Sequence, residues 1–181
     1  EALDNYLFNE AAGTLYQFFW HRFCDWYLEL IKPILYRKRG EKVLEETQTT
    51  LFYVLDQSLR LLHPFMPFLT EEIWQLIPHE GTSIVKAAYP VFEDALVNKA
   101  ASDDMEMVIQ AITGIRNIRG EMEIPPSTLL QTIVATRDDK AEDLLNACAE
   151  DIRELARLKD ISIQQDAPRP KGSASAIFPR F

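Results

Sequence analysis

Residues 5–36 read NYLFNEAAGTLYQFFWHRFCDWYLELIKPILY, and this stretch decides the fold class. Its apolar side chains recur at three- and four-residue spacing, which predicts one long amphipathic helix with its stripe in a bundle core. We expect Asp4 to cap the start of the helix. We expect Pro33 to kink or interrupt its last turns, because proline removes a backbone hydrogen bond. The stripe consists of Leu7, Phe8, Ala11, Leu15, Phe18, Phe19, Phe23, Trp26, Leu30 and Ile34.

Two further helices follow the same period, over residues 46–62 and from Ser102 to about Gly120. Residues 63–68 contain two prolines, so they predict a bent connector, and their apolar character favours burial. A short helix should follow, with Thr70 as its N-cap.

The segment between the short helix and the third long helix reads as a loop over residues 79–101. Within it, residues 84–89 resemble an extended piece that ends at Pro90.

The pattern changes after Pro126. Residues 129–136 alternate and are rich in β-branched side chains, which predicts a strand, and residues 160–165 predict a second one. Residues 139–158 between them have a helical period, and another strand is expected to begin near Ala174.

We therefore predict a mainly α fold, a helical bundle with a small C-terminal α/β appendage. The predicted domains are residues 1–122 for the bundle, 123–166 for a strand–helix–strand subdomain and 167–181 for a truncated tail.

Composition excludes several classes of protein. The 181 residues carry a formal net charge of −9, with two cysteines and three histidines. The cysteines are too few for a disulfide framework and the histidines have no metal-ligand spacing, so we expect a cytoplasmic protein without a metal site. No apolar run is long enough to span a bilayer, so no membrane partner is expected. No phosphate loop or nucleophile motif occurs, and we expect no catalytic residue in this chain.

Three strings are more specific than a helical period requires: FFWHRFCDWYLE at 18–29, LRLLHPFMPFLTEEIW at 59–74 and IRNIRGEMEIPP at 115–126. Together and in this order they resemble the anticodon-binding domain of the class I aminoacyl-tRNA synthetases for valine, isoleucine and leucine. The first and third strings most resemble the bacterial valyl branch. The resemblance is strong over residues 5–126 and weaker as far as residues 173–176.

The resemblance implies a helical domain that binds the anticodon stem-loop of valine tRNAs within a longer ligase. That enzyme joins valine to its tRNA using ATP, edits mischarged tRNA in a separate domain and carries a C-terminal coiled-coil arm. We expect this chain to be a non-catalytic piece without a cofactor of its own, whose partners are tRNA, the catalytic domain and that arm. Since the family usually has another helix before the position of Glu1, its loss could expose an apolar face and favour dimerisation.

Two alternatives stay open. One is the same domain of the isoleucyl or leucyl enzyme. The other is a helical protein-interaction module without an RNA role, which the acidic net charge would suit.

The candidate tRNA contacts are one aromatic residue and a set of basic and polar residues. An exposed Trp20 could stack an unpaired base, and a basic cluster between Lys32 and Lys42 could hold phosphates or be a solvated loop. The basic residues near Ile118 could instead bond buried carbonyls between helices. The full set is Trp20, Arg22, Lys32, Arg37, Lys38, Arg39, Arg116, Asn117 and Arg119.

Overall fold

The computed structural model describes residues 1–36 and 40–177. It divides into two compact units, Glu1–Asp94 and Ala95–Phe181. Helices dominate both, with one two-stranded sheet, so the predicted mainly α fold with a small α/β part is confirmed. None of the described helices is both long enough and apolar enough to cross a membrane.

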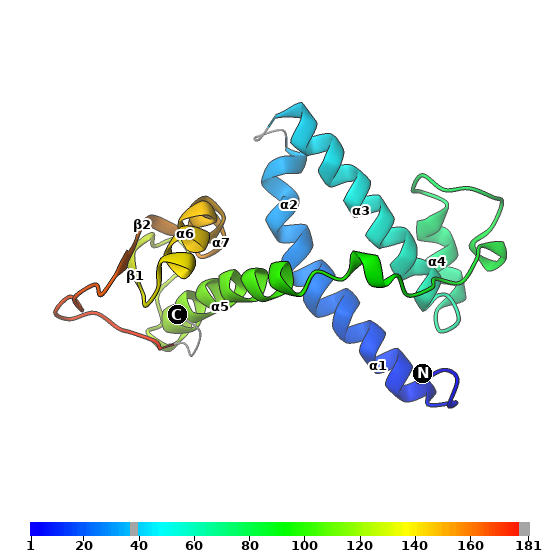
Figure 1. The fold of residues 1–181 in the computed structure, drawn as a ribbon, viewed down its shortest axis with the longest axis horizontal. Coiled ribbons are helices and arrows are strands. Elements are labelled where there is room, and N and C mark those ends of the chain that lie inside the picture. Colours follow the sequence, from blue (N-terminus) through cyan, green and yellow to red (C-terminus); the bar gives the residue numbers. More distant parts are fainter. Residues whose placement is uncertain (37–39, 178–181) are drawn as a thin grey trace. The chain divides into compact units, whose positions relative to one another are not determined.

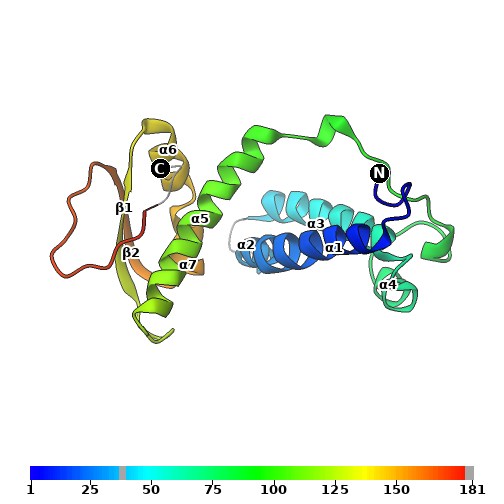
Figure 2. The ribbon, with the colours of Figure 1, turned by 90° about the horizontal axis from the view of Figure 1, so that it is seen from below.

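The first unit is built on one continuous helical run that α3 (Glu41–Leu62) accompanies in the return direction (Figures 1 and 2). The run consists of α1 (Phe8–Phe18), the π-helical η1 (Phe19–Tyr27) and α2 (Leu28–Leu35). The predicted long helix is therefore present, although its middle third has wider turns than an α-helix.

The ends of this run differ from the prediction. Leu7, not Asp4, occupies the N-cap position, and the Asp4 carboxylate lies 3.0 Å from the N-terminal ammonium. Pro33 lies inside α2, which continues to Leu35. Leu7, Phe8 and Phe18 were expected in the core but are 41%, 54% and 44% exposed.

The core of the first unit gathers where α3 meets α4 (Pro67–Trp74). Leu59, Trp74 and Ile84 are buried together there. Thr70 is buried inside α4 rather than at its N-cap, and its hydroxyl lies 2.7 Å from Nδ1 of His63. The first residue of the helix is Pro67, whose fixed φ suits this position and whose missing N–H would have no partner there.

Two expectations for this region are wrong. The connector over residues 63–68 is largely exposed rather than buried, since only His63 and Phe65 are half-covered. The predicted extended piece begins with a 3₁₀ turn, η2 (Ile84–Lys86). A carboxylate binds the start of this turn: Glu71 Oε2 accepts hydrogen bonds from Ser83 Oγ at 2.7 Å and from the Ile84 amide at 3.1 Å.

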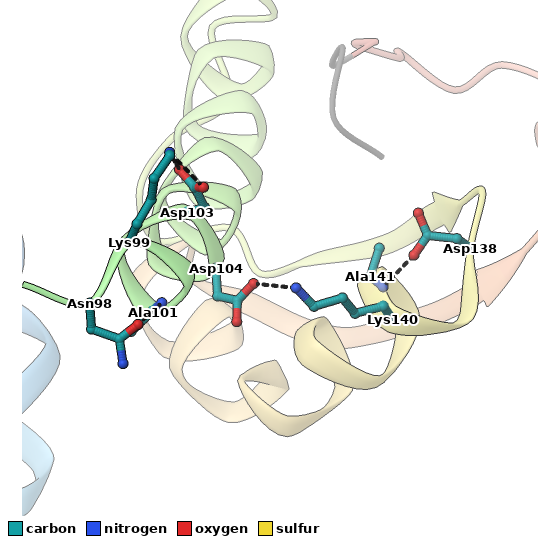
Figure 3. Close-up of polar contacts among 8 residues, drawn as sticks. All are labelled: Asn98, Lys99, Ala101, Asp103, Asp104, Asp138, Lys140 and Ala141. Carbon is teal, nitrogen blue, oxygen red and sulfur yellow. Dashed lines mark hydrogen bonds and ion pairs between the residues drawn. The ribbon is translucent and has the colours of Figure 1, made fainter.

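The boundary between the two units falls within the short 3₁₀ turn η3 (Asp94–Leu96). The long helix α5 (Lys99–Glu121) follows it in the second unit. The helix begins before Ser102, because the Asn98 side chain accepts a hydrogen bond from the Ala101 amide at 3.0 Å (Figure 3). Lys140 Nζ lies 3.1 Å from Asp104 Oδ1 and joins the first turn of α6 to α5 (Figure 3).

The rest of this unit is a strand–helix–strand arrangement of β1 (Leu130–Thr136), α6 (Asp139–Ala147), α7 (Ala149–Leu155) and β2 (Leu158–Gln165). The strands pair in parallel, from Leu130 with Leu158 to Thr136 with Gln165. The crossover between them is long, as parallel strands require.

Two details of the second unit correct the prediction. The helix expected over residues 139–158 breaks at Cys148, whose φ of −100° and ψ of 8° leave the helical region. Residues 174–177 contain no strand, so the strand expected near Ala174 is absent from the described residues.

The division of the chain also differs from the division expected at residue 122. Helix α5 belongs to the same compact unit as the sheet, whereas the sequence grouped it with the bundle. Within this unit, arginines of α5 bond to backbone carbonyls around α7 and the start of β2.

Candidate nucleic-acid interface

The solvent face around the junction of α1 and η1 carries an aromatic platform, which we define as Tyr16, Trp20 and His21. Trp20 is 51% exposed, and its ring lies nearly parallel to that of Tyr16, with 6.4 Å between centroids and 5° between planes. The His21 ring meets Tyr16 edge-on at 5.9 Å. On the other side, His21 Nδ1 lies 3.0 Å from Asp25 Oδ2. The exposed indole therefore stacks on Tyr16 of the same helical run, and Tyr16 in turn contacts His21.

The opposite face of the same segment belongs to the core. Phe23 is buried and stacks between Phe19, at 5.4 Å, and Tyr27, at 5.7 Å. Burial raises the pKa of the Tyr27 hydroxyl. Burial, with the nearby charge of Asp25, raises the pKa of the Cys24 thiol as well, which lowers its reactivity. The FFWHRFCDWY string thus divides into a core face and a solvent face, as expected for Trp20.

The basic side chains of the first unit differ in whether they are paired with an acidic side chain. Arg22 is exposed beside Trp20 on η1. The Lys32 ammonium is paired with the Glu29 carboxylate one helical turn earlier. Lys42 is exposed, with its nitrogen 3.8 Å from Glu46 Oε1. The predicted contacts Arg37, Lys38 and Arg39 lie outside the described residues.

The arginines of the third string, in the second unit, bond to carbonyl groups. Arg119 is 8% exposed. Its Nη2 donates to the carbonyls of Pro125 and Thr128, both at 2.9 Å, and its Nη1 donates to that of Arg157 at 3.3 Å. Arg116, which is exposed, donates through Nε and Nη2 to the Leu155 carbonyl at 3.1 and 2.8 Å. Arg116 and Arg119 therefore bond to backbone carbonyls, which was the structural alternative to tRNA contact.

The turns that Arg119 joins are conformationally demanding. Glu123 and Arg157 both have positive φ, of 52° and 55°. The Glu123 amide donates to Gly120 at 3.1 Å and the Ile124 amide donates to Arg119 at 2.9 Å, which forms a Schellman motif after α5. Glycine usually occupies the position of Glu123 in this motif. The Arg119 guanidinium therefore stabilises two left-handed turns.

Asn117 lies between these arginines but is exposed. It therefore remains an accessible polar group in the third string. Among the described residues, no group of three or more His, Cys, Asp or Glu side chains could hold a metal ion.

Sequence reasoning missed Tyr16 and His21 as parts of the platform. The spacing of Tyr16 and Trp20, four residues apart, is a usable signal because such pairs meet on one helix face.

Comparison with known families defines the class of the protein. A family model described as the anticodon-binding domain of tRNA ligase matches residues 1–134, which include the whole first unit, α5 and most of β1. The chain therefore belongs to the family of anticodon-binding domains of tRNA ligases.

Similar curated proteins carry a more particular name. Valine–tRNA ligases of Geobacter sulfurreducens, Syntrophotalea carbinolica and Enterococcus faecalis are 48%, 41% and 40% identical over 182, 181 and 178 residues. Each match covers 98% of this chain but only 20% of the relative. The chain thus spans a small part of the length of these relatives.

Proposed function

We propose that this chain binds the anticodon stem-loop of valine tRNAs as one domain of a valine–tRNA ligase. The observation that carries the proposal is the exposed Trp20 ring, stacked on Tyr16 within the segment that matches the anticodon-binding family. Sequence-specific readers of single-stranded RNA commonly stack splayed-out bases on such rings. Stacking of this kind contributes about 1–3 kcal/mol per base.

The arrangement of the platform supports this role. Because the Trp20 ring already stacks on Tyr16, which also meets His21 edge-on, little side-chain entropy is lost when a base arrives. The exposed Asp25 carboxylate accepts from His21 and could also accept from a base edge. A π-helical segment of this kind is frequent at functional sites.

Phosphate contacts are proposed to come from the basic residues around α2 and the start of α3. The net charge of −9 repels RNA at long range, so a local cluster must supply the attraction. The candidates are Arg22, Lys32 and Lys42, together with the three basic residues at 37–39. Lys32 would have to exchange its Glu29 partner for a phosphate, which makes its contribution smaller than that of Lys42.

The activity of the whole protein is a further part of the proposal. The names of the relatives support attachment of valine to tRNA with ATP, rather than the isoleucyl or leucyl reaction. In that protein, the catalytic and editing domains and the coiled-coil arm would lie outside residues 1–181. This chain would fix the anticodon end, so that the acceptor end reaches the catalytic domain in the cytoplasm.

Fluorescence anisotropy tests the binding directly. A labelled valine anticodon stem-loop, a scrambled-loop control and an isoleucine stem-loop would be titrated with the chain at about 50 and 200 mM salt. We expect the valine stem-loop to bind more tightly than either control at both salt concentrations, with all three affinities lower at the higher one. Equal affinity for all three RNAs would contradict anticodon reading within these residues.

A further inference from the structure

Helix α4 has exposed apolar side chains on the side opposite its buried residues. Its inner side carries the buried Thr70 and Trp74. Its outward side, which we call the outer α4 face, carries the exposed apolar residues Phe68 and Leu69, with Leu76 just beyond the helix end and the exposed polar residues Glu72 and Gln75 among them. Phe68 is 89% exposed, although it lies only two residues, or about 200° of helical rotation, from Thr70. Exposed apolar side chains grouped among polar ones mark an interaction site more often than scattered ones do.

The outer α4 face is held rigidly. The Trp74 indole donates to Asp56 Oδ1 at 2.7 Å, which anchors the helix to α3. The Glu71 carboxylate accepts hydrogen bonds from Gln75, Ser83 and the Ile84 amide, which anchors it to the following loop. Because these contacts fix α4 beforehand, a partner would bind without ordering the helix.

The charge around this face does not suit RNA. Between Pro64 and Asp94 the only basic residue is Lys86. The acidic residues of the same segment are Glu71, Glu72, Glu80, Glu93 and Asp94. A phosphate backbone would be repelled there, whereas a protein surface with basic residues around an apolar centre would be complementary.

The small size of the face indicates what covers it. Three exposed apolar side chains offer less area than the roughly 800 Å² per partner that a stable complex between separate proteins buries. A tethered partner needs less area, because linkage raises its effective concentration to the millimolar range. The chain covers only 20% of the length of its relatives, so most of such a polypeptide lies outside residues 1–181.

We propose that the outer α4 face docks against an apolar surface with a basic rim, located elsewhere in the same polypeptide. This proposal rests on the proposed function, since it treats residues 1–181 as one domain of a longer ligase. The face would then fix the orientation of this domain relative to the rest of the protein, separately from the aromatic platform that contacts RNA.

Hydrogen–deuterium exchange on the 181-residue chain and on the full-length protein tests the docking. We expect the side chains of Phe68 and Leu69 to be covered in the full-length protein, so that amides of residues 66–76 exchange at least about tenfold more slowly there. Amides of α6 serve as the internal reference. Equal exchange of residues 66–76 in both proteins would overturn the proposal.

A substitution separates docking from folding. Phe68→Ser should leave the melting temperature of the 181-residue chain unchanged, because the ring is exposed, yet abolish the additional protection in the full-length protein. Tyr36→Ser is the matched control, an exposed aromatic residue away from α4 that should leave the protection intact. If Phe68→Ser leaves the protection in place, docking through this face is excluded.

Two other occupants would give different results. Slow exchange in the 181-residue chain that depends on protein concentration and disappears with Phe68→Ser would identify a second copy. Protection that appears only with the anticodon stem-loop would identify RNA. Either result overturns the proposal. Anisotropy with the stem-loop tests the RNA function separately, and Phe68→Ser should not change that affinity.

Discussion

Segment η1 and the C-terminal turns of α5 both carry strings typical of the family, but their polar side chains are positioned differently. On η1, the side chains of Trp20 and His21 are held by Tyr16 and Asp25 of the same helical run, and their outer surfaces face solvent. At the end of α5, Arg119 reaches carbonyls of other segments and is almost fully buried.

This contrast shows that a basic residue in a family motif need not contact the ligand. The guanidinium of Arg119 presents several donors in one plane, which suits carbonyls arriving from different turns. The aromatic platform differs from Arg119, because its exposed indole stacks on Tyr16 of its own helical run and stabilises little of the fold. Substitutions in the two strings should therefore separate stability from RNA affinity.

The largest effect is expected from the core that supports the first unit. Trp74→Ala should lower the free energy of unfolding by about 3–5 kcal/mol, because a 2% exposed indole and its bond to Asp56 are lost. Phe65→Ala should cost only about 1–2 kcal/mol, since Phe65 is half-buried. Chemical denaturation followed by the fluorescence of Trp20 and Trp26 measures both. Equal costs would contradict this distinction.

Arg119→Met should destabilise the second unit by about 2–4 kcal/mol, because it leaves the carbonyls of Pro125 and Thr128 without their donor. All three tryptophans of the chain precede residue 95, so their fluorescence reports the first unit alone. We expect circular dichroism to show early unfolding while the fluorescence transition stays in place.

Arg116→Met is the matched control for Arg119→Met. It should cost less, since Arg116 is exposed and its carbonyl partner, Leu155, can be hydrated. A larger loss for Arg116→Met than for Arg119→Met would contradict the assignment of Arg119 as the main connection between these turns.

Glu123→Gly should stabilise the second unit by about 0.5–1 kcal/mol, because glycine adopts the positive φ of 52° without steric cost. Glu121→Gly, two residues earlier at the last position of α5, should destabilise it by a similar amount. Thermal melts of the two variants should therefore shift in opposite directions. A shift in the same direction would refute the Schellman geometry.

The smallest effect concerns pH. Hydrogen bonds from Gln75, Ser83 and the Ile84 amide lower the pKa of Glu71 below its ordinary value of 4.5. A carboxyl group with a lowered pKa in the folded state contributes stability above its ordinary value and loses it as the pH falls through the lowered pKa. Melting temperatures between about pH 6 and pH 3 should therefore fall less steeply in Glu71→Gln than in wild type. Identical slopes would rule out this contribution.

Much of the fold could be predicted from local patterns. The period of three and four residues located the helical run over 8–35, and β-branched alternation located β1. The errors arose where distant groups determine the backbone. The Glu71 carboxylate shapes η2, and the break at Cys148 interrupts a helix whose apolar period continues.

The candidate site was predictable to a similar extent. The exposure of Trp20 followed from its position on a different helix face from Phe19 and Phe23. The carbonyl partners of Arg119 could not be identified, because they lie 6, 9 and 38 residues away along the chain. The stacking of Tyr16 on Trp20 could have been inferred from spacing alone.

The most direct test compares the dissociation constants of wild type, Trp20→Ala and Asn117→Ala for the valine anticodon stem-loop at one salt concentration. Both positions are exposed, one on η1 and one at the end of α5. We predict that Trp20→Ala weakens binding about 5- to 150-fold, the equivalent of about 1–3 kcal/mol, with an unchanged melting temperature. Asn117→Ala should bind like wild type. If Asn117→Ala weakens binding and Trp20→Ala binds like wild type, Trp20 is not the residue that stacks the anticodon base.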